Sequence, residues 1–408
     1  MNPTATKADT PKTSASKPRA LKPTALALKN LVADWRRLAL GVSGVAFATV
    51  LMFMQNGFRN ALLDSPVQLL QKLDCDLIGI SIARFSLPTD QTFPASLVER
   101  SLSNAMVQTA KPMFLERVRA QVRVPGNPRR PIRVVALEPE PGWFNDDQIE
   151  LQLPKLHAAG TALLDQSSRS TYGFAIHDPE QLTGQVIELS DQRIRIVGLV
   201  RIGTDFANDG TLILSRNTFR QYFPMRAGGN PTAEVDLALF KLKADANLES
   251  VAAQLTALDP RLWIVMPREA LIRREIEFWN RQTPIGMIFF VGSIMGFAVG
   301  VIICYQVLFT SIHDSLPEFA TLKAMGYSNG YFVWLVMKQA TYLALMGFVP
   351  AFLVSGIIFE MIQATVGLPM LFTLARVLLV LGLTTAMCLI SGLLALRRLL
   401  SADPASLF

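Results

Sequence analysis

The sequence contains little charge, little cysteine and little histidine for a chain of its length. Asp, Glu, Lys and Arg make up 17% of the 408 residues, whereas hydrophobic residues make up 50%. This composition is too apolar for an ordinary soluble enzyme. The three cysteines, Cys75, Cys304 and Cys388, lie far apart in the chain, and the three histidines share no ligand spacing. We therefore expect neither an intrachain disulfide framework nor a metal site.

Motifs for nucleotide hydrolysis and for nucleophilic catalysis are also missing. The sequence has no Gly-x-x-x-x-Gly-Lys-Ser/Thr loop, no Gly-x-Ser-x-Gly and no His-Glu-x-x-His. Without these motifs it lacks a phosphate cradle and a nucleophile with an adjacent base. We expect no catalytic residue and no cofactor bound directly to this chain.

Four long apolar stretches account for the hydrophobic excess. Leu38–Met54 has 17 residues without charge, and Ile285–Phe309 has 25. At about 1.5 Å per helical residue the second crosses a hydrocarbon core of about 30 Å, and the first is at the short limit. Two more spans are expected at 340–360 and 377–396, joined by a short outer loop at 361–376. The predicted fold class is a membrane protein with four transmembrane α-helices, one before and three after a large domain.

Basic residues are concentrated before the first apolar stretch. Residues 1–37 hold eight Lys and Arg against two Asp, a net charge of +6, whereas residues 60–281 carry 25 basic and 26 acidic side chains. A basic flank tends to stay in the cytoplasm. We therefore expect a multi-pass protein of the inner (plasma) membrane, in contact with membrane lipid. Both termini, including 397–408, should be cytoplasmic and the large domain periplasmic.

The N-terminal region allows two other interpretations. The basic tail could bind nucleic acid, but its Pro, Ser, Thr and Ala residues come without aromatics, which favours a disordered cytoplasmic tail and no nucleic-acid partner. Leu38–Met54 could be a cleaved signal peptide, but no small-x-small cleavage site follows it. A retained membrane anchor is therefore expected.

An apolar helical stripe continues beyond the membrane at each end of the large domain. Residues 38–73 are predicted to form the first span and an outgoing stalk helix. Residues 267–309 are predicted to form a returning stalk, with Pro267 as its first helical residue, and the second span. The two stalks should pack on each other. The alternative is two independent amphipathic helices lying on the lipid surface.

Short alternating runs between the stalks predict a mixed α+β domain over residues 74–266. Val118–Val124 alternates with period two and is predicted to form a hairpin with Ile132–Leu137. The pattern also allows two lobes, with the second inserted at about 140–230.

The loop at 310–339 is expected to carry a short amphipathic helix in the cytoplasm. Pro317 is expected to open the helix, and Glu318 suits its positive N-terminal dipole. Gly326 suits a left-handed cap at the other end. A cytoplasmic partner can hold such a helix in a groove, and the alternative is an interfacial helix lying on lipid. Its apolar face is predicted from three residues: Phe319, Leu322 and Met325.

The run from Glu318 to Gly326 resembles the Glu-x-x-x-Leu-Lys-Ala-x-Gly box of FtsX/MacB-type permeases, the mechanotransmitting subunits of ABC transporters. The one-plus-three layout agrees with that family over the whole chain. The resemblance implies a non-catalytic subunit whose loop docks on a separate ABC ATPase, with ATP and Mg bound by that partner. The implied docking residues are Glu318, Phe319, Leu322, Lys323, Met325 and Gly326. The C-terminal residues that resemble the family's basic stretch and Asp-Pro-Ala ending are Arg397, Arg398, Asp403 and Pro404.

A narrower resemblance concerns the run from Leu51 to Ser65, which is similar to DevC-like permeases of cyanobacterial glycolipid exporters. It implies export of a lipid, a glycolipid or another amphiphile. The implied partners are a periplasmic membrane-fusion adaptor and, indirectly, a TolC-like outer-membrane channel. Two alternatives remain open: a lipoprotein-release permease, and a non-transporting FtsX-type regulator of a cell-wall hydrolase.

Small residues recur at helical spacing in two of the predicted spans. Gly292, Gly296 and Gly300 lie on one face of the second span, and Gly44 and Ala48 on one face of the first. Small residues let another helix approach closely in lipid. These faces are predicted either to pack within one chain or to form the seam of a homodimer.

Overall fold

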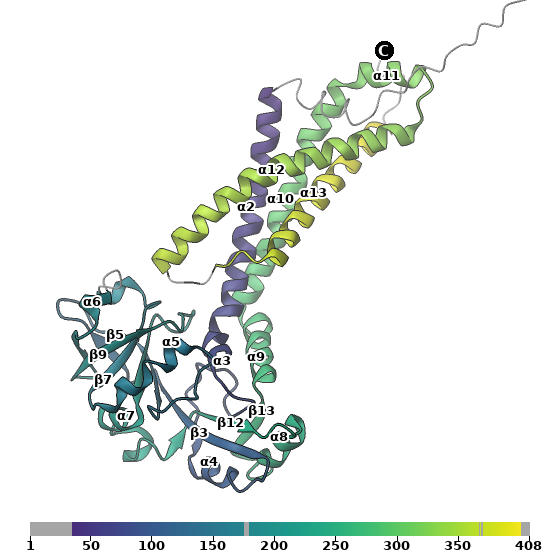
Figure 1. The fold of residues 1–408 in the computed structure, drawn as a ribbon. Helices are drawn as coiled ribbons and strands as arrows, with labels where there is room; N and C mark the ends of the chain where they lie inside the picture. The colour runs from purple at the N-terminus through teal and green to yellow at the C-terminus, as the bar shows by residue number, and fades with distance from the viewer. Residues whose placement is uncertain (1–34, 175–178, 367, 369, 401–408) are drawn as a thin grey trace, which may run out of the picture. The chain divides into compact units, whose positions relative to one another are not determined.

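The computed structural model describes residues 35–174, 179–366, 368 and 370–400 (Figure 1). The chain divides into two compact units. One unit holds the described residues up to Thr49, Phe297–Pro350 and the described residues from Leu381 onward. The other unit holds Val50–Gly296 and Ala351–Val380.

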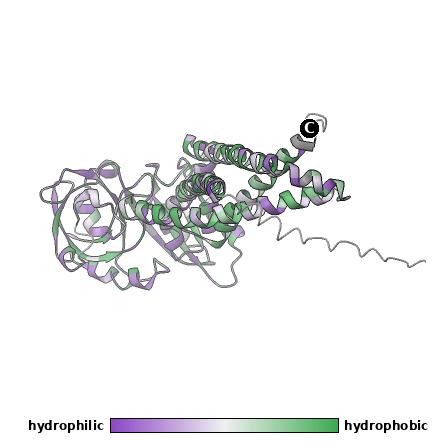
Figure 2. Cartoon of the chain, turned by 90° about the horizontal axis from the view of Figure 1, so that it is seen from above, coloured by the Kyte–Doolittle hydropathy of each residue, from purple (hydrophilic) through white to green (hydrophobic). Residues whose placement is uncertain are grey.

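Four of the described helices are long and apolar enough to cross a membrane. They contain 27 to 38 residues, more than the roughly 20 that a hydrocarbon core of about 30 Å requires. Figure 2 shows hydrophobic residues along their length. One precedes the large domain and three follow it, as predicted. The four are α2 (Trp35–Asp64), α10 (Pro284–Asp314), α12 (Asn329–Val366) and α13 (Leu374–Leu400).

The region between the first two membrane helices, here called the large domain, is a mixed α/β fold with an eleven-stranded sheet and a two-stranded sheet of β2 and β11. Its strands are β1 (Leu77–Ser81), β2 (Phe93–Pro94), β3 (Val107–Glu116), β4 (Gln121–Arg123), β5 (Arg130–Pro131), β6 (Arg133–Leu137), β7 (Thr161–Asp165), β8 (Val186–Leu189), β9 (Gln192–Val200), β10 (Thr211–Ser215), β11 (Glu234–Val235), β12 (Leu237–Leu242) and β13 (Trp263–Pro267). Its helices are α4 (Ser96–Ser101), α5 (Asp147–Glu150), η2 (Leu153–His157), η3 (Ser170–Tyr172), α6 (Pro179–Leu182), α7 (Arg216–Tyr222), η4 (Arg226–Gly229) and α8 (Leu248–Thr256).

Eleven of these strands form a continuous sheet in the order β13-β1-β12-β3-β6-β10-β7-β9-β8-β4-β5. Strand β3 joins its two halves, because it pairs with β12 through Val107–Met113 and with β6 through Phe114–Glu116. The strands beyond β3 come from residues 121–215, so they begin earlier than the second lobe expected at about 140–230.

The predicted hairpin of Val118–Val124 with Ile132–Leu137 forms only beside its turn, where β4 and β5 pair antiparallel and the Ile132 N–H donates to the Ala120 carbonyl at 3.0 Å. Strand β4 pairs with the two-residue β5, whereas β6 pairs with β3 on one side and, in parallel, with β10 on the other. Every residue of β6 is buried. A strand buried on both faces belongs in the interior of a sheet, between two neighbours.

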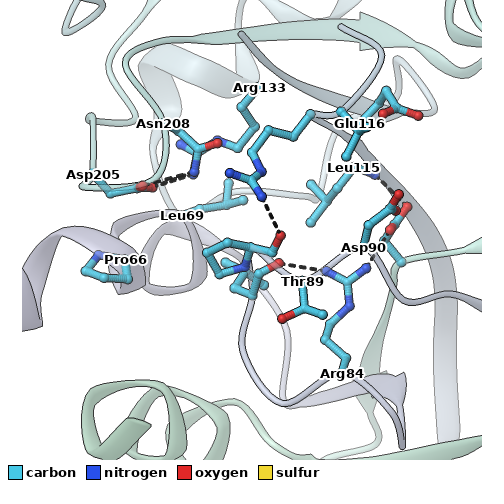
Figure 3. A pocket seen from close by; sticks show the side chains of 15 residues that line it. Pro66, Leu69, Arg84, Thr89, Asp90, Leu115, Glu116, Arg133, Asp205 and Asn208 are labelled. Atoms are coloured by element: carbon cyan, nitrogen blue, oxygen red, sulfur yellow. Dashed lines mark hydrogen bonds and ion pairs between the residues drawn. The ribbon is translucent and has the colours of Figure 1, made fainter. Parts of the chain in front are cut away.

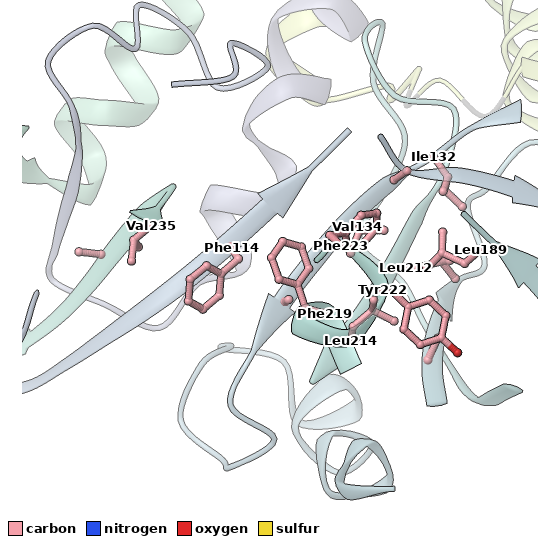
Figure 4. Packing of buried hydrophobic residues seen from close by; sticks show 14 of the residues in the cluster. Phe114, Ile132, Val134, Leu189, Leu212, Leu214, Phe219, Tyr222, Phe223 and Val235 are labelled. Atoms are coloured by element: carbon pink, nitrogen blue, oxygen red, sulfur yellow. The ribbon is translucent and has the colours of Figure 1, made fainter. Parts of the chain in front are cut away.

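Both faces of the sheet carry an apolar core. One face packs Phe114 and Leu212 against Phe219 of α7, with the rings of Phe114 and Phe219 5.6 Å apart (Figure 4). The other face, which includes Met113 and Ile213, packs against residues of the stalk.

The stalk consists of short helices that continue the first two membrane helices. After α2 the chain forms η1 (Ser65–Val67) and α3 (Gln68–Lys72), and before α10 it forms α9 (Arg268–Glu277) and η5 (Phe278–Gln282). Both η1 and α3 contact α9, as expected for stalks that pack on each other. Pro267 is the last residue of β13 and precedes the first helical residue, because its ψ of 141° is extended. Pro267 therefore occupies the N-cap position of α9, and Arg268 is the first helical residue of the returning stalk.

Candidate functional site

The loop between α10 and α12 contains a short helix, α11 (Leu316–Ala324), with the cap predicted at Gly326. Pro317 is the second helical residue, not the first. Gly326 has a φ of +92°, the left-handed conformation that glycine adopts without strain. Its N–H donates to the Lys323 carbonyl at 3.0 Å, and the Tyr327 N–H donates to the Leu322 carbonyl at 3.2 Å. These two bonds form a Schellman motif, which fixes where the helix ends and how the chain leaves it.

Two residues of the predicted apolar face, Leu322 and Met325, have described side chains, and they differ in exposure. Leu322 is 9% exposed, buried within its own chain, whereas Met325 is 62% exposed. Met325 is the C-cap residue, and its N–H still donates to the Thr321 carbonyl at 3.1 Å, so it continues the helical path while its side chain stays uncovered. Glu318 and Lys323 are exposed at the two ends of the helix. The side chain of Phe319 lies outside the described part of the chain.

Only part of the predicted C-terminal motif falls within the described residues. Arg397 lies near the end of α13 and is exposed. Arg398 is helical, but its side chain is not described, and Asp403 and Pro404 lie outside the described residues.

The glycines of α10 face α2 of the same chain. This holds for the part of the helix pair that lies in each of the two compact units. A Cβ on Gly300 would lie 3.0 Å from the Ala48 Cβ, and one on Gly44 would lie 2.5 Å from the Ile303 Cγ2. Further along the helix, a Cβ on Gly292 would meet the Gln55 side chain at 2.5 Å, and Gly296 lies beside Met52. Of the two interpretations of this face, the structure shows packing within one chain.

A polar seam within the membrane helices was not found from the sequence. Three buried side chains at i, i+4 and i+7 of α13 each meet a polar group of another helix. Thr384 lies 3.2 Å from the Thr49 hydroxyl of α2, Cys388 lies 3.4 Å from the Cys304 sulfur of α10, and Ser391 donates to the Val301 carbonyl at 2.8 Å. Polar groups on one face of an apolar helix favour association in lipid, so their spacing was a usable signal.

The base of the stalk borders a cavity of about 40 Å³ in the large domain (Figure 3). Pro66 and Leu69 of the stalk line it, together with Arg84, Arg133 and Asn208. Figure 3 shows Arg84 and Asn208 on opposite sides of this cavity. A cavity of this size holds a water molecule but not an organic substrate.

Arg84 joins a loop beside the cavity to the sheet. It is buried and donates to the carbonyls of Leu87 and Gln91 and to Asp236 Oδ1, the last at 2.6 Å. Asp236 also accepts from Arg226 and from the Leu115 N–H. Because each buried charge has a partner of opposite sign, this network is electrostatically satisfied.

The same loop is tied to the stalk helix α9. Glu275 of α9 is 2% exposed and accepts hydrogen bonds from the Leu87 N–H at 3.0 Å and from Trp279 Nε1 at 2.9 Å. Arg274 donates to the Arg84 carbonyl at 2.9 Å. Burial raises the pKa of Glu275, because it removes water from the carboxylate. A displacement of α9 would therefore pull directly on this loop.

Two family models match the sequence. Residues 38–258, more than half of the chain, match the model described as a MacB-like periplasmic core domain. Residues 290–404 match the model described as an FtsX-like permease C-terminal domain. Among curated proteins, none matches the chain.

Solved structures of similar domains cover about half of the chain. The periplasmic region of MacB from Actinobacillus actinomycetemcomitans is 14% identical, with a TM-score of 0.33, over 53% of this chain and 97% of its own. The extracellular domain of the noncanonic ABC-type transporter YknZ from Gram-positive bacteria is 11% identical, with a TM-score of 0.31, over 47% and 98%. A domain of a putative permease from Porphyromonas gingivalis is 11% identical, with a TM-score of 0.30, over 50% and 93%.

Proposed function

Because the chain belongs to the FtsX/MacB family of permeases, we propose that it transmits the motion of a partner ATPase to its large domain to drive export. It is the permease component of a MacB/FtsX-type ABC transporter, a multi-pass, non-catalytic transmembrane subunit whose family implies an ABC ATPase as partner. Under this proposal the chain binds no cofactor itself, and ATP and Mg remain on the ATPase.

Helix α11 is the proposed docking element for the ATPase. The observation that carries this assignment is a short, exposed helix between two membrane helices, held by a Schellman motif at a fixed end. Met325 offers an exposed apolar anchor, and Glu318 and Lys323 offer charges at the rim. Buried anchors supply most of the energy of such contacts, and rim charges supply little. Leu322 is instead assigned to hold the helix in place from inside.

The stalk is the proposed route of the motion. Helix α2 continues through η1 into α3, and α9 leads through η5 into α10. Residues Leu69 and Leu70 of α3 and Leu271 and Ile272 of α9 pack in the core of the large domain. Because packed cores resist deformation, a displacement of these helices is passed to the sheet.

The proposed orientation, cargo and remaining partners rest on the charge pattern and on the family resemblance. The basic N-terminal flank supports cytoplasmic termini in an inner membrane, with the large domain periplasmic. The run from Leu51 to Ser65 supports a DevC-like exporter of a lipid, glycolipid or other amphiphile, with an adaptor and, through it, a TolC-like channel. The permease is further proposed to act as a homodimer. Exposed side chains such as Met287, Ile294 and Ile302 leave another α10 face for a second copy or for lipid.

Site-specific photocrosslinking in intact cells tests the docking element and the orientation together. A photoreactive amino acid at Met325 should capture an ABC ATPase. The matched control is Met225 of the large domain, which is 80% exposed and should capture no ATPase. Capture of the ATPase from Met225, or none from Met325 in a cell that assembles the transporter, contradicts the proposal.

A further inference from the structure

Two of the three cysteines meet within the membrane helices. Cys304 of α10 and Cys388 of α13 are 84 positions apart, both are fully buried, and their sulfur atoms lie 3.4 Å apart. A buried residue touches about ten others, so a chosen pair among some 400 residues meets by chance about once in forty. With three cysteines and hence three pairs, the chance that any two meet is under about one in ten. The contact between the two thiols therefore suggests that they react with each other.

The surrounding contacts hold the two helices close at this level. Gly300 lies one turn before Cys304, and a Cβ there would lie 2.0 Å from the Met387 sulfur. Ser391, one turn after Cys388, donates to the Val301 carbonyl at 2.8 Å. A disulfide requires the sulfur atoms to come to about 2.05 Å, which from 3.4 Å is an approach of about 1.4 Å. Side-chain rotation and a small shift of either helix can supply that approach.

We propose that Cys304 and Cys388 form a redox-active thiol pair whose oxidation to a disulfide fixes α13 to α10. In this step both S–H bonds break and one S–S bond forms. The two electrons and two protons pass to a quinone dissolved in the membrane, which becomes the hydroquinone. A thiol reductant reverses the step by exchange. Both thiols are buried between the helices, so the reaction requires a transient separation of α10 and α13, and within the apolar membrane interior a neutral quinone enters such an opening more readily than a charged water-borne oxidant.

The disulfide would replace a non-covalent contact of the polar seam by a covalent one. Helix α10 ends at Asp314, directly before α11, so a link between α10 and α13 limits how far α11 can carry α10 with it. This consequence for transport rests on the proposed function, whereas the thiol chemistry does not.

Counting free thiols on the full-length protein in lipid nanodiscs tests the thiol pair. The protein is treated with a short-chain ubiquinone, whose fully substituted ring has no open position for thiol addition, then quenched, denatured and alkylated with iodoacetamide, and the alkyl groups are counted by mass. We expect three alkyl groups before oxidation, one after it, on Cys75, and three again after dithiothreitol. The thermal midpoint of the oxidised protein should rise and return to its first value on reduction.

Two variants separate this pairing from other reactions. Cys388→Ser should carry two alkyl groups with or without quinone, and its thermal midpoint should not respond to quinone. Cys75→Ser should fall from two alkyl groups to none. Three alkyl groups on the wild-type chain after quinone, or a disulfide between two chains on a non-reducing gel, overturns the proposal.

The ATPase rate of the assembled transporter separates this inference from the proposed function. Loss of ATPase stimulation on oxidation, restored by dithiothreitol, supports both. If the disulfide forms without changing the ATPase rate, the thiol pair stands and the proposed movement of α10 against α13 is wrong.

Discussion

At the scale of single residues, the burial of Cys75 limits the reactivity of its thiol. Cys75 is 8% exposed, and burial raises the pKa of its thiol to about 12. Because the thiolate is the reactive form, little of it exists near neutral pH. We expect a water-soluble maleimide to leave Cys75 unlabelled in the native protein and to label it within minutes after denaturation. Native labelling at the rate of a free thiol would show that the segment before β1 opens to water.

Gly300 permits the close approach of α2, α10 and α13. A side chain there would collide with Met387 and press on Ala48, so Gly300→Val should destabilise the helices by about 1–3 kcal/mol. Gly382 of α13 has no atom within 4 Å of its Cβ position, so Gly382→Val is the matched control and should leave the thermal midpoint nearly unchanged. Equal midpoints for the two variants would mean that the Gly300 face is open, contrary to the packing described.

Glu275 should make stability depend on pH in a defined direction. Its pKa is raised in the folded protein by burial, so the folded state holds the proton more tightly than the unfolded state. Stability therefore falls as pH rises from the ordinary Glu value, about 4.3, through the raised folded value. Glu275→Gln removes this step while leaving an acceptor for the Leu87 N–H. Thermal midpoints of both proteins across that window should diverge with rising pH, and parallel curves would refute the assignment.

At the scale of the element, α11 combines one buried and one exposed apolar residue. Leu322→Asp places a charge in the interior and should cost several kcal/mol, so the variant should accumulate poorly or unfold at a lower temperature. Met325→Asp lies on the surface and should change stability by no more than about 0.5 kcal/mol. Equal losses of stability would mean that Leu322 does not anchor the helix.

The membrane helices and the end of α11 were predictable because their signals are local. Each long apolar run must be helical in lipid, since every backbone group has to be satisfied within the segment. A glycine after a short amphipathic run predicts a left-handed cap, as seen at Gly326. The contact of Cys388 with Cys304 joins helices that are 84 positions apart in the chain, and no local signal specifies it.

At the scale of the whole molecule, strand pairing was the least predictable feature. Alternation identifies a strand but not its neighbour, and β6 pairs with β10, some 80 residues later, instead of completing the predicted hairpin. Parallel pairs such as β7 with β9 require crossover connections whose partners are chosen by the core they jointly bury. The glycines of α10 illustrate the same limit. Their spacing predicts that another helix packs closely against them, but it does not indicate which helix.

The ATPase activity of the transporter reconstituted in nanodiscs tests the central claim most directly. Met325→Asp should leave the permease folded but remove the apolar anchor, so the ATPase should no longer co-purify and its stimulation by the permease should fall at least about tenfold, as expected for loss of an anchor worth about 1.4 kcal/mol or more. Met225→Asp makes the same change at an exposed methionine of the large domain and should keep both properties. If Met325→Asp retains full ATPase binding and stimulation, α11 is not the docking element and the proposed transmission of force through it is wrong.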